Sequence, residues 1–240
     1  MALNPQQANQ VRQQLQRHNR ECVLGSIPLD PHAAASLELI IERGVFGSDI
    51  MSSGIYLAQY LYANKEAYAG KTVLDMGCGP GTQGIIMAKY GAKEVTLSDN
   101  NPAAVENTKR NIKKHKLDNA TAYVSDLFKD LPNRRYDVIV FNHPFFPEDA
   151  AKFGQDACSD LMLRKSMLGG TELISRFFET AGDYLAPSGR IIMPYFHFAG
   201  PENDPANHTQ KYGFRVAQMQ LVQSTQGLQL GRFSIYEITR

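Results

Sequence analysis

Hydrophobic and polar positions along this chain follow two periodicities. From residue 71 onward, short and almost entirely apolar segments alternate with longer segments whose apolar residues recur every three or four positions. The short segments predict buried strands, and the longer segments predict amphipathic helices. Strands that alternate with helices favour a parallel, doubly wound sheet, so we expect an α/β fold with a Rossmann-like, seven-stranded sheet.

The predicted strands share an apolar centre, and the first two end in an aspartate. They cover residues 71–76, 94–99, 120–124, 136–141 and 190–194, followed by 214–222 and 233–238. We expect the last two to form an antiparallel pair, joined by a turn that contains Gly227, while the others run parallel. The helices predicted between the strands cover 82–90, 102–115 and 170–185, and a turn is predicted at 187–189.

The segment ahead of the first strand is predicted to be helical. A helix over 5–20 begins after Asn4, a good N-cap, and places a proline at its first position. The spacing of apolar residues predicts a second helix over 32–43 and a third over 52–62. We therefore divide the chain into an N-terminal helical extension or lid, 1–45, and a sheet domain, 46–240.

Composition narrows the class of protein. The 240 residues carry 25 Lys and Arg against 24 Asp and Glu, a net charge of +1, which disfavours a bulk electrostatic grip on nucleic acid. The three cysteines, Cys22, Cys78 and Cys158, form no CxxC pair, so we expect neither a disulfide framework nor a metal site. Without a predicted signal peptide or membrane span, a reducing cytoplasm is the expected compartment.

A glycine-rich loop carries the strongest chemical signal. The sequence Val-Leu-Asp-Met-Gly-Cys-Gly-Pro-Gly over 73–81 is an apolar strand that ends in Asp75 and opens into three alternate glycines before a helix. Glycines allow the backbone to turn sharply and to approach a ligand closely. An acid just before the loop repels phosphate and attracts a cation or an amine.

Two more acids follow the next two strands. Asp99 ends the second strand, where a carboxylate can accept both hydroxyls of a ribose. Asp126 follows the third strand, where it can meet an exocyclic amine of a base. Because parallel strands end at one edge of a sheet, we expect these acids and the glycine loop to share one ligand site.

These motifs resemble the class I S-adenosylmethionine-dependent methyltransferases over about residues 44–194. The resemblance implies S-adenosylmethionine as cofactor, with Asp99 on its ribose and Asn100 beside its adenine. It implies that the cofactor is bound by Asp75, Gly77, Cys78, Gly79, Asp99, Asn100, Asp126, Leu127 and Asn142.

A second motif narrows the subgroup. The fourth strand ends in Phe141-Asn-His-Pro-Phe145, which resembles the Asn-Pro-Pro-Tyr/Phe motif of methyltransferases that modify planar nitrogens. Those families include release-factor glutamine, adenine-N6 DNA and small-domain ribosomal RNA guanine methyltransferases. The stretches 44–46 and 168–173 also resemble the small-domain group.

The physical chemistry of this motif points to a planar NH₂ group. The side-chain oxygen of Asn142 and the backbone carbonyl of residue 143 can accept its two N–H bonds, while Phe145 stacks on the plane. His143 stands where the family has its first proline, and it is either a general base or a packing residue. Pro144 and Tyr195 are further candidates for substrate contact.

The sequence allows several methyl acceptors and three hypotheses for the activity. A small molecule or a protein side chain is favoured as the methyl acceptor, nucleic acid is disfavoured by the charge, and no membrane partner is expected. A second hypothesis keeps the cofactor but transfers or cyclises its methionine-derived chain, with methylthioadenosine as the product. A third hypothesis is a protein without catalytic activity that binds only the cofactor or a partner.

Overall fold

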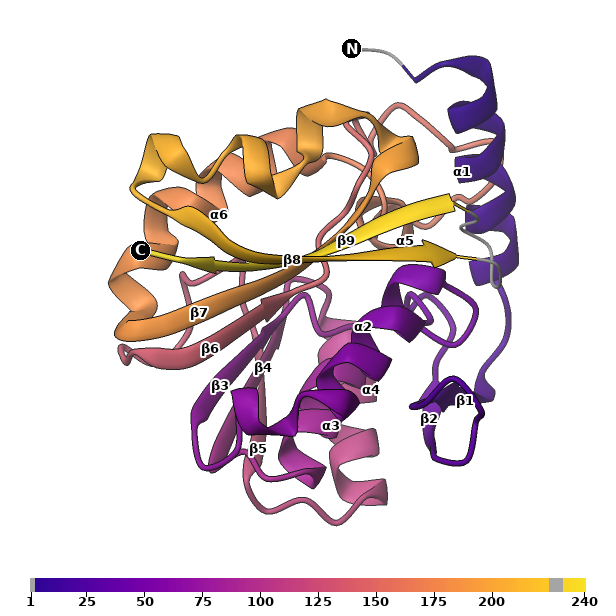
Figure 1. The fold of residues 1–240 in the computed structure, drawn as a ribbon. Coiled ribbons are helices and arrows are strands. Elements are labelled where there is room, and N and C mark those ends of the chain that lie inside the picture. Colours follow the sequence, from indigo (N-terminus) through magenta and orange to yellow (C-terminus); the bar gives the residue numbers. More distant parts are fainter. Residues whose placement is uncertain (1–2, 225–230) are drawn as a thin grey trace.

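A seven-stranded sheet forms the centre of the computed structural model, which describes residues 3–224 and 231–240. Its order is β5-β4-β3-β6-β7-β9-β8 (Figure 1). The strands are β3 (Thr72–Met76), β4 (Glu94–Asp99), β5 (Ala120–Val124), β6 (Tyr136–Phe141), β7 (Leu185–Phe196), β8 (Arg215–Ser224) and β9 (Gly231–Thr239). Strands β3 to β7 pair in parallel, and β9 is antiparallel to both β7 and β8. The predicted fold class is therefore confirmed.

Helices cover both faces of the sheet. They are α1 (Pro5–His18), α2 (Ser52–Ala63), α3 (Thr82–Lys89), α4 (Pro102–Lys114), α5 (Leu161–Lys165) and α6 (Gly170–Tyr184). Figure 1 shows α2, α3 and α4 together on one face and α6 on the other. Five one-turn 3-10 helices complete the described chain: η1 (Lys65–Ala67), η2 (His197–Ala199), η3 (Pro201–Asn203), η4 (Pro205–Asn207) and η5 (Gln210–Tyr212).

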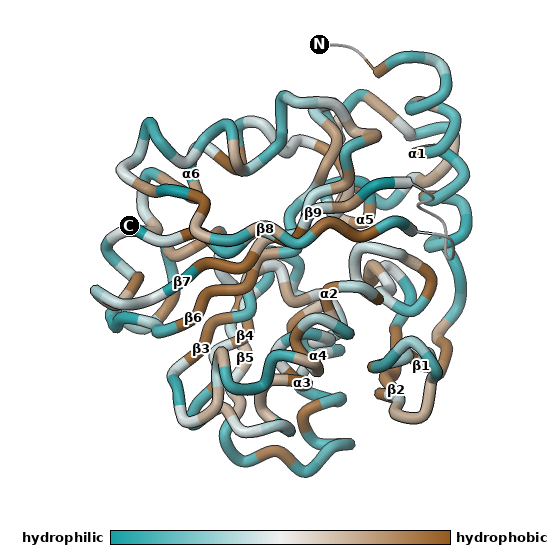
Figure 2. The backbone as a smooth tube through the Cα atoms, viewed as in Figure 1, coloured by the Kyte–Doolittle hydropathy of each residue, from teal (hydrophilic) through white to brown (hydrophobic). Residues whose placement is uncertain are grey.

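Alternating side chains of the central strands divide the core into two layers. On β6, Ile139 and Phe141 pack with α6, whereas Val138 and Val140 pack with α2 and α3. Figure 2 shows this apolar centre as hydrophobic strands between more polar connections. A parallel strand with helices on both faces must be apolar on both faces, as the sequence of β6 is.

The helix predicted over residues 32–43 is wrong. These residues contribute β2 (Ser36–Ile41), which pairs antiparallel with β1 (Val23–Pro28) in a separate hairpin. Leu37, Leu39 and Ile41 are buried in alternation with less buried neighbours, which is the period of a strand. Leu37, Ile40 and Ile41 are three and four positions apart, which also fits a helix. In so short a segment the periods of a helix and of a strand are hard to tell apart.

The N-terminal region packs into both layers of the core. Val11 and Leu15 of α1 lie in the layer of α6, and the hairpin residues lie in the layer of α2 and α3. The term helical extension therefore holds only for α1. The division at residue 45, and a role as a lid, remain predictions.

The C-terminal strands need one correction. The predicted turn at 187–189 lies within β7, where pairing with β6 moves from Leu185 opposite Tyr136 to Arg190 opposite Val138. The chain bulges there but remains part of the strand. The predicted turn at Gly227 lies outside the described residues. No helix within the described chain is long and apolar enough to span a bilayer.

Candidate active site

The loop between β3 and α3 forms one end of a large cavity at the carboxyl edge of the sheet. Gly77 and Gly79 have φ angles of +64° and +55°, a region that favours glycine. Helix α4 holds the loop from behind, because the Thr108 hydroxyl donates to the Gly79 carbonyl at 2.8 Å. The Asn111 amide donates to the Pro80 carbonyl at 2.9 Å. One side of the loop backbone therefore faces the cavity, and the other side is hydrogen-bonded to α4.

Asp99 lies at the end of β4 and lines this cavity. One carboxylate oxygen accepts the backbone N–H of Gly79 at 2.9 Å, and the other accepts that of Asn101 at 2.9 Å. Burial raises the carboxyl pKa, while the backbone N–H groups oppose that rise. Asp99 thus joins the glycine loop to the next strand and retains oxygen lone pairs for a ligand.

Asp75 has a different position from the one predicted for a direct ligand contact. Its side chain is buried beneath the loop, outside the cavity lining, and accepts the backbone N–H of Gly84 in α3 at 2.7 Å. Burial raises the pKa of the Asp75 carboxyl to about 7. The structure therefore places Asp75 as a support for the loop and the first turn of α3.

The other predicted residues at this end line the cavity. They are Gly77, Cys78, Gly79, Asn100, Asp126 and Leu127. Asp126 is partly exposed and forms an ion pair with Arg176 of α6 at 2.5 Å, a partner that the sequence did not indicate. Leu127 has a φ angle of +53°, which is unusual for a residue with a side chain.

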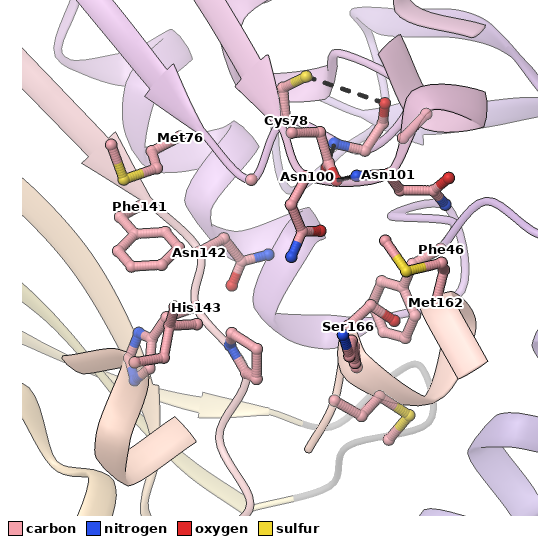
Figure 3. Close-up of a pocket in the computed structure, with 18 of the residues that line it drawn as sticks. Phe46, Met76, Cys78, Asn100, Asn101, Phe141, Asn142, His143, Met162 and Ser166 are labelled. Atoms are coloured by element: carbon pink, nitrogen blue, oxygen red, sulfur yellow. Dashed lines mark hydrogen bonds between the residues drawn. The ribbon is translucent and has the colours of Figure 1, made fainter. Parts of the chain in front are cut away.

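The Asn-His-Pro-Phe motif follows β6 and lines the middle of the same cavity. Figure 3 shows the side chains of Asn142 and Asn100 pointing toward each other, with Phe46 and Met162 on the opposite wall. Within the described chain the Asn142 amide has no hydrogen-bond partner given by the structure, so it remains available to a ligand. The structure therefore brings the motif and the glycine loop into one site, as predicted.

His143 belongs to the cavity lining, but its Nε2 is turned toward a backbone carbonyl behind the cavity. Its side chain is buried, and Nε2 faces the backbone carbonyl of Asn203 at 3.3 Å, which lies outside the cavity lining. Burial lowers the His143 pKa to about 3, so the ring is neutral and a weak base near pH 7. The geometry supports the packing alternative for this residue.

Tyr195, unlike His143, does not line the cavity. It is 1% exposed, its ring stacks on His143 with centroids 6.0 Å apart, and its hydroxyl donates to the Gly200 carbonyl. The predicted substrate contact is therefore corrected to a contact behind His143. Pro144 and Phe145 do line the cavity.

The wall opposite the motif comes from segments that were not predicted as part of the site. They contribute Phe46, Ser48, Met51, Ser53, Met162, Lys165, Ser166 and Met167. The stretch 44–46 had been noted for its resemblance alone, and the residues of α5 carried no recognisable signal. We call this wall, together with Pro144, Phe145 and Phe146, the Phe46 end of the cavity, and the opposite part the glycine-loop end.

Helix α1 holds two segments of the Phe46 end together. His18 stacks on Phe46 with ring centroids 4.1 Å apart, and its Nε2 faces the Gly47 carbonyl at 3.0 Å. Arg12 forms an ion pair with Asp156 at 2.8 Å, in the segment that leads to α5. The N-terminal helix therefore connects both segments but does not itself line the cavity.

Charge is unevenly distributed along the cavity. Both carboxylates of its lining, Asp99 and Asp126, lie at the glycine-loop end. Lys165 is the lone Lys or Arg of the described lining and lies at the Phe46 end, where the other lining residues are apolar or serine. Within the described chain, Lys165 belongs to none of the ion pairs.

Comparison with known families identifies the fold and the cofactor. The family model described as "Methyltransferase small domain" matches residues 36–208. The chain belongs to this family. It is an S-adenosylmethionine-dependent methyltransferase of class I.

Two relatives with different named acceptors are similar to this chain. A Methanocaldococcus jannaschii protein that carries the name of a protein N5-glutamine methyltransferase is 33% identical over 61% of this chain and 72% of its own length. Ribosomal RNA small subunit methyltransferase C of Erwinia tasmaniensis is 30% identical over 55% of this chain. The chain spans only 37% of that second relative.

Solved structures agree on the fold. A 16S rRNA N2 methyltransferase from T. Thermophilus, in complex with AdoMet and guanosine, superposes with a TM-score of 0.60 at 20% identity. The match covers 92% of this chain and 50% of that one. A ribosomal protein L11 methylase from Lactobacillus delbrueckii gives a TM-score of 0.57 at 17% identity, over 78% and 79% of the two chains.

The position of Asp75 predicts a pH dependence of stability. A carboxyl whose pKa is raised to about 7 in the folded protein holds a proton that the unfolded chain releases near pH 4. The contribution of Asp75 to the free energy of unfolding should therefore fall as pH rises from about 4 to 7, by up to about 1.4 kcal/mol per pH unit. Asp75→Asn should lack this fall, measured by urea unfolding of both proteins without cofactor. Parallel pH profiles would show that Asp75 is not protonated in the folded state.

Proposed function

We propose that this methyltransferase transfers the methyl group to a nitrogen atom of an acceptor bound at the Phe46 end of the cavity. The observation that carries the proposal is the free side-chain amide of Asn142, which lines the cavity between the two ends. Its oxygen and the backbone carbonyl of residue 143 are the acceptors for two N–H bonds of a planar nitrogen. Such contacts orient the nitrogen and favour the positive charge that develops on it.

The residues at the glycine-loop end fit S-adenosylmethionine. The loop of Gly77, Cys78 and Gly79 offers backbone to the methionine part, and Asp99 offers carboxylate oxygens to the ribose. Asn100, Asp126 and Leu127 would lie against the adenine. The cofactor supplies an electrophilic methyl group on a sulfonium. Asp75 is buried outside the cavity lining and would support this end from below.

The Phe46 end suits a planar acceptor. Phe145, Phe46 and Met162 present rings and a thioether, which pack against flat groups. Lys165 adds one ammonium group to this lining of apolar residues and serines. Because an anion is costly to bury without a counter-charge, we infer that the acceptor carries a carboxylate or phosphate next to its nitrogen-bearing group.

Nucleic acid and protein acceptors both remain within this proposal. The names of relatives include a protein glutamine and a ribosomal RNA acceptor, so the low net charge does not exclude RNA. Helix α4 carries the basic residues Lys109, Arg110, Lys113 and Lys114. They favour neither acceptor, because Arg110 pairs with Glu42 at 2.5 Å and Lys114 with Glu38 at 3.5 Å. Both acids belong to β2 or follow it, so much of this charge is neutralised within the fold. Cytoplasmic location stays a prediction.

Replacement of Asp99 tests the cofactor site. Asp99→Ala should weaken binding of S-adenosylhomocysteine by about 2 kcal/mol, roughly thirtyfold, because charged hydrogen bonds to the ribose are lost. Isothermal titration calorimetry measures this change. Asp183→Ala, at an exposed position of α6, is the control. An unchanged affinity would remove Asp99 from the site.

Replacement of Asn142 tests the acceptor site. Asn142→Ala should lower the rate of methyl transfer about a hundredfold and leave S-adenosylhomocysteine affinity within about twofold. The rate is measured with guanosine, guanosine monophosphate and a glutamine-containing peptide as acceptors. Asn133→Ala, on an exposed loop, is the control. Equal losses of rate and cofactor affinity would assign Asn142 to the cofactor instead.

The nucleoside product of the same reactions separates the reaction types. Methyl transfer releases S-adenosylhomocysteine, which mass spectrometry detects. Methylthioadenosine from S-adenosylmethionine alone would instead establish transfer or cyclisation of the methionine-derived chain. Tight cofactor binding without either product would favour a protein that only binds.

Replacement of Lys165 tests the charge of the acceptor. Lys165→Gln should raise the Kd of guanosine monophosphate about tenfold in the presence of S-adenosylhomocysteine, and leave that of guanosine unchanged. Lys152→Gln, whose side chain is 86% exposed outside the cavity, is the matched control. Calorimetry that compares free glutamine with glutamine whose α-carboxylate is converted to an amide extends the test to carboxylates. A loss of S-adenosylhomocysteine affinity alone would place Lys165 on the cofactor carboxylate.

A further inference from the structure

Asn203 touches both sides of the acceptor motif, although it lies sixty residues further along the chain. It ends η3 and is 1% exposed. Its side-chain amide donates to the Phe145 carbonyl at 2.8 Å, and its backbone carbonyl faces His143 Nε2 at 3.3 Å. Its side-chain oxygen accepts the hydroxyl of Thr171, at the start of α6. One buried residue therefore holds the two residues that flank Pro144.

We propose that His143 and Asn203 form a positioning pair that holds the backbone of residues 142–145 in the geometry needed for the acceptor nitrogen. The pair would supply the rigidity that a proline at position 143 supplies in the motif this sequence resembles. A proline ring fixes φ near −65°, whereas a histidine leaves φ free unless its side chain is held. This inference rests on the proposed acceptor role of Asn142 and of the carbonyl of residue 143.

The packing around His143 supports this role. The ring stacks on Tyr195 and meets Phe145 edge to face, with centroids 5.1 Å apart. The tautomer with hydrogen on Nε2 donates to the Asn203 carbonyl, and the rings of Phe141, Phe145 and Tyr195 lie against the imidazole. Within the described chain, Nδ1 is buried without a hydrogen-bond partner. His143 is therefore fixed as a neutral hydrogen-bond donor.

Gly170, the first residue of α6, allows Asn203 and Pro144 to approach α6 closely. A Cβ there would lie 2.4 Å from the Asn203 side-chain nitrogen and 2.4 Å from the Pro144 carbonyl oxygen, distances that real Cβ atoms do not show. The motif, η3 and the first turn of α6 thus meet at a point with no room for a side chain. Such a junction holds the carbonyl of residue 143 relative to the sheet.

Loss of this pair is expected to lower the rate of methyl transfer rather than the affinity for the cofactor. A displacement of the motif by about 1 Å misplaces the acceptor nitrogen and can cost a hundredfold in rate, with little effect on the cofactor. A residue needed only for folding would instead lower the stability and cofactor affinity together. The two roles are therefore separable by measurement.

The experiment compares wild type with Asn203→Ala, His143→Pro and the double variant. Rates of methyl transfer to guanosine and to a glutamine-containing peptide are measured, together with S-adenosylhomocysteine affinity. Asn203→Ala should lower kcat at least tenfold with affinity unchanged within twofold. The double variant should regain most of this rate, because proline at 143 replaces the lost support. Asn207→Ala, an exposed position of the same loop, is the control.

Hydrogen exchange gives a readout that needs no acceptor. The N–H of Phe146, which donates to the Met167 carbonyl at 3.1 Å, should exchange faster in Asn203→Ala and return toward the wild-type rate in the double variant. Equal impairment of the single and double variants, or a fall of cofactor affinity in step with kcat, would overturn the proposal. If wild type methylates neither acceptor, the proposed function fails on these acceptors, and unchanged exchange in Asn203→Ala still overturns the positioning pair.

Discussion

The site depends first on a carboxylate that joins two loops from neighbouring strands. Asp99 accepts backbone N–H groups of Gly79 and Asn101, so the ends of β3 and β4 are held at one distance. The glycine loop could otherwise adopt many conformations, since glycine loses more backbone freedom on ordering than other residues. Thr108 and Asn111 of α4 hold the same loop from behind. The ligand-facing backbone is therefore ordered by side chains that lie mostly outside the cavity.

The opposite end of the cavity is assembled from distant parts of the chain. Phe46 is supported by His18 of α1, and the motif is supported by Asn203 of η3. Neither His18 nor Asn203 lies near the strands β3 and β4 in the sequence, which carry the glycine loop and Asp99. The two ends of the cavity are therefore held by separate sets of contacts.

Patterns that are local in sequence predicted much of the molecule. The strands of the sheet, the helices between them and the cap at Asn4 follow from short-range periodicity and capping chemistry. The hairpin of β1 and β2 did not, because the spacing of Leu37, Ile40 and Ile41 also fits a helix. The burial of Leu37, Leu39 and Ile41 in the layer of α2 and α3 decided for a strand.

The sequence by itself determined that Asp99, Asp126 and Asn142 would meet, because they end parallel strands of one sheet and such ends share an edge. It could not decide which of the acids faces the ligand. Burial placed Asp75 under the loop and left Asp99 on the cavity wall. Only the tertiary structure decided that His143 lies against Asn203 and Tyr195, and that Phe46 and Lys165 complete the cavity. These contacts join residues far apart in the chain, and their geometry depends on how whole elements pack, which no local pattern encodes.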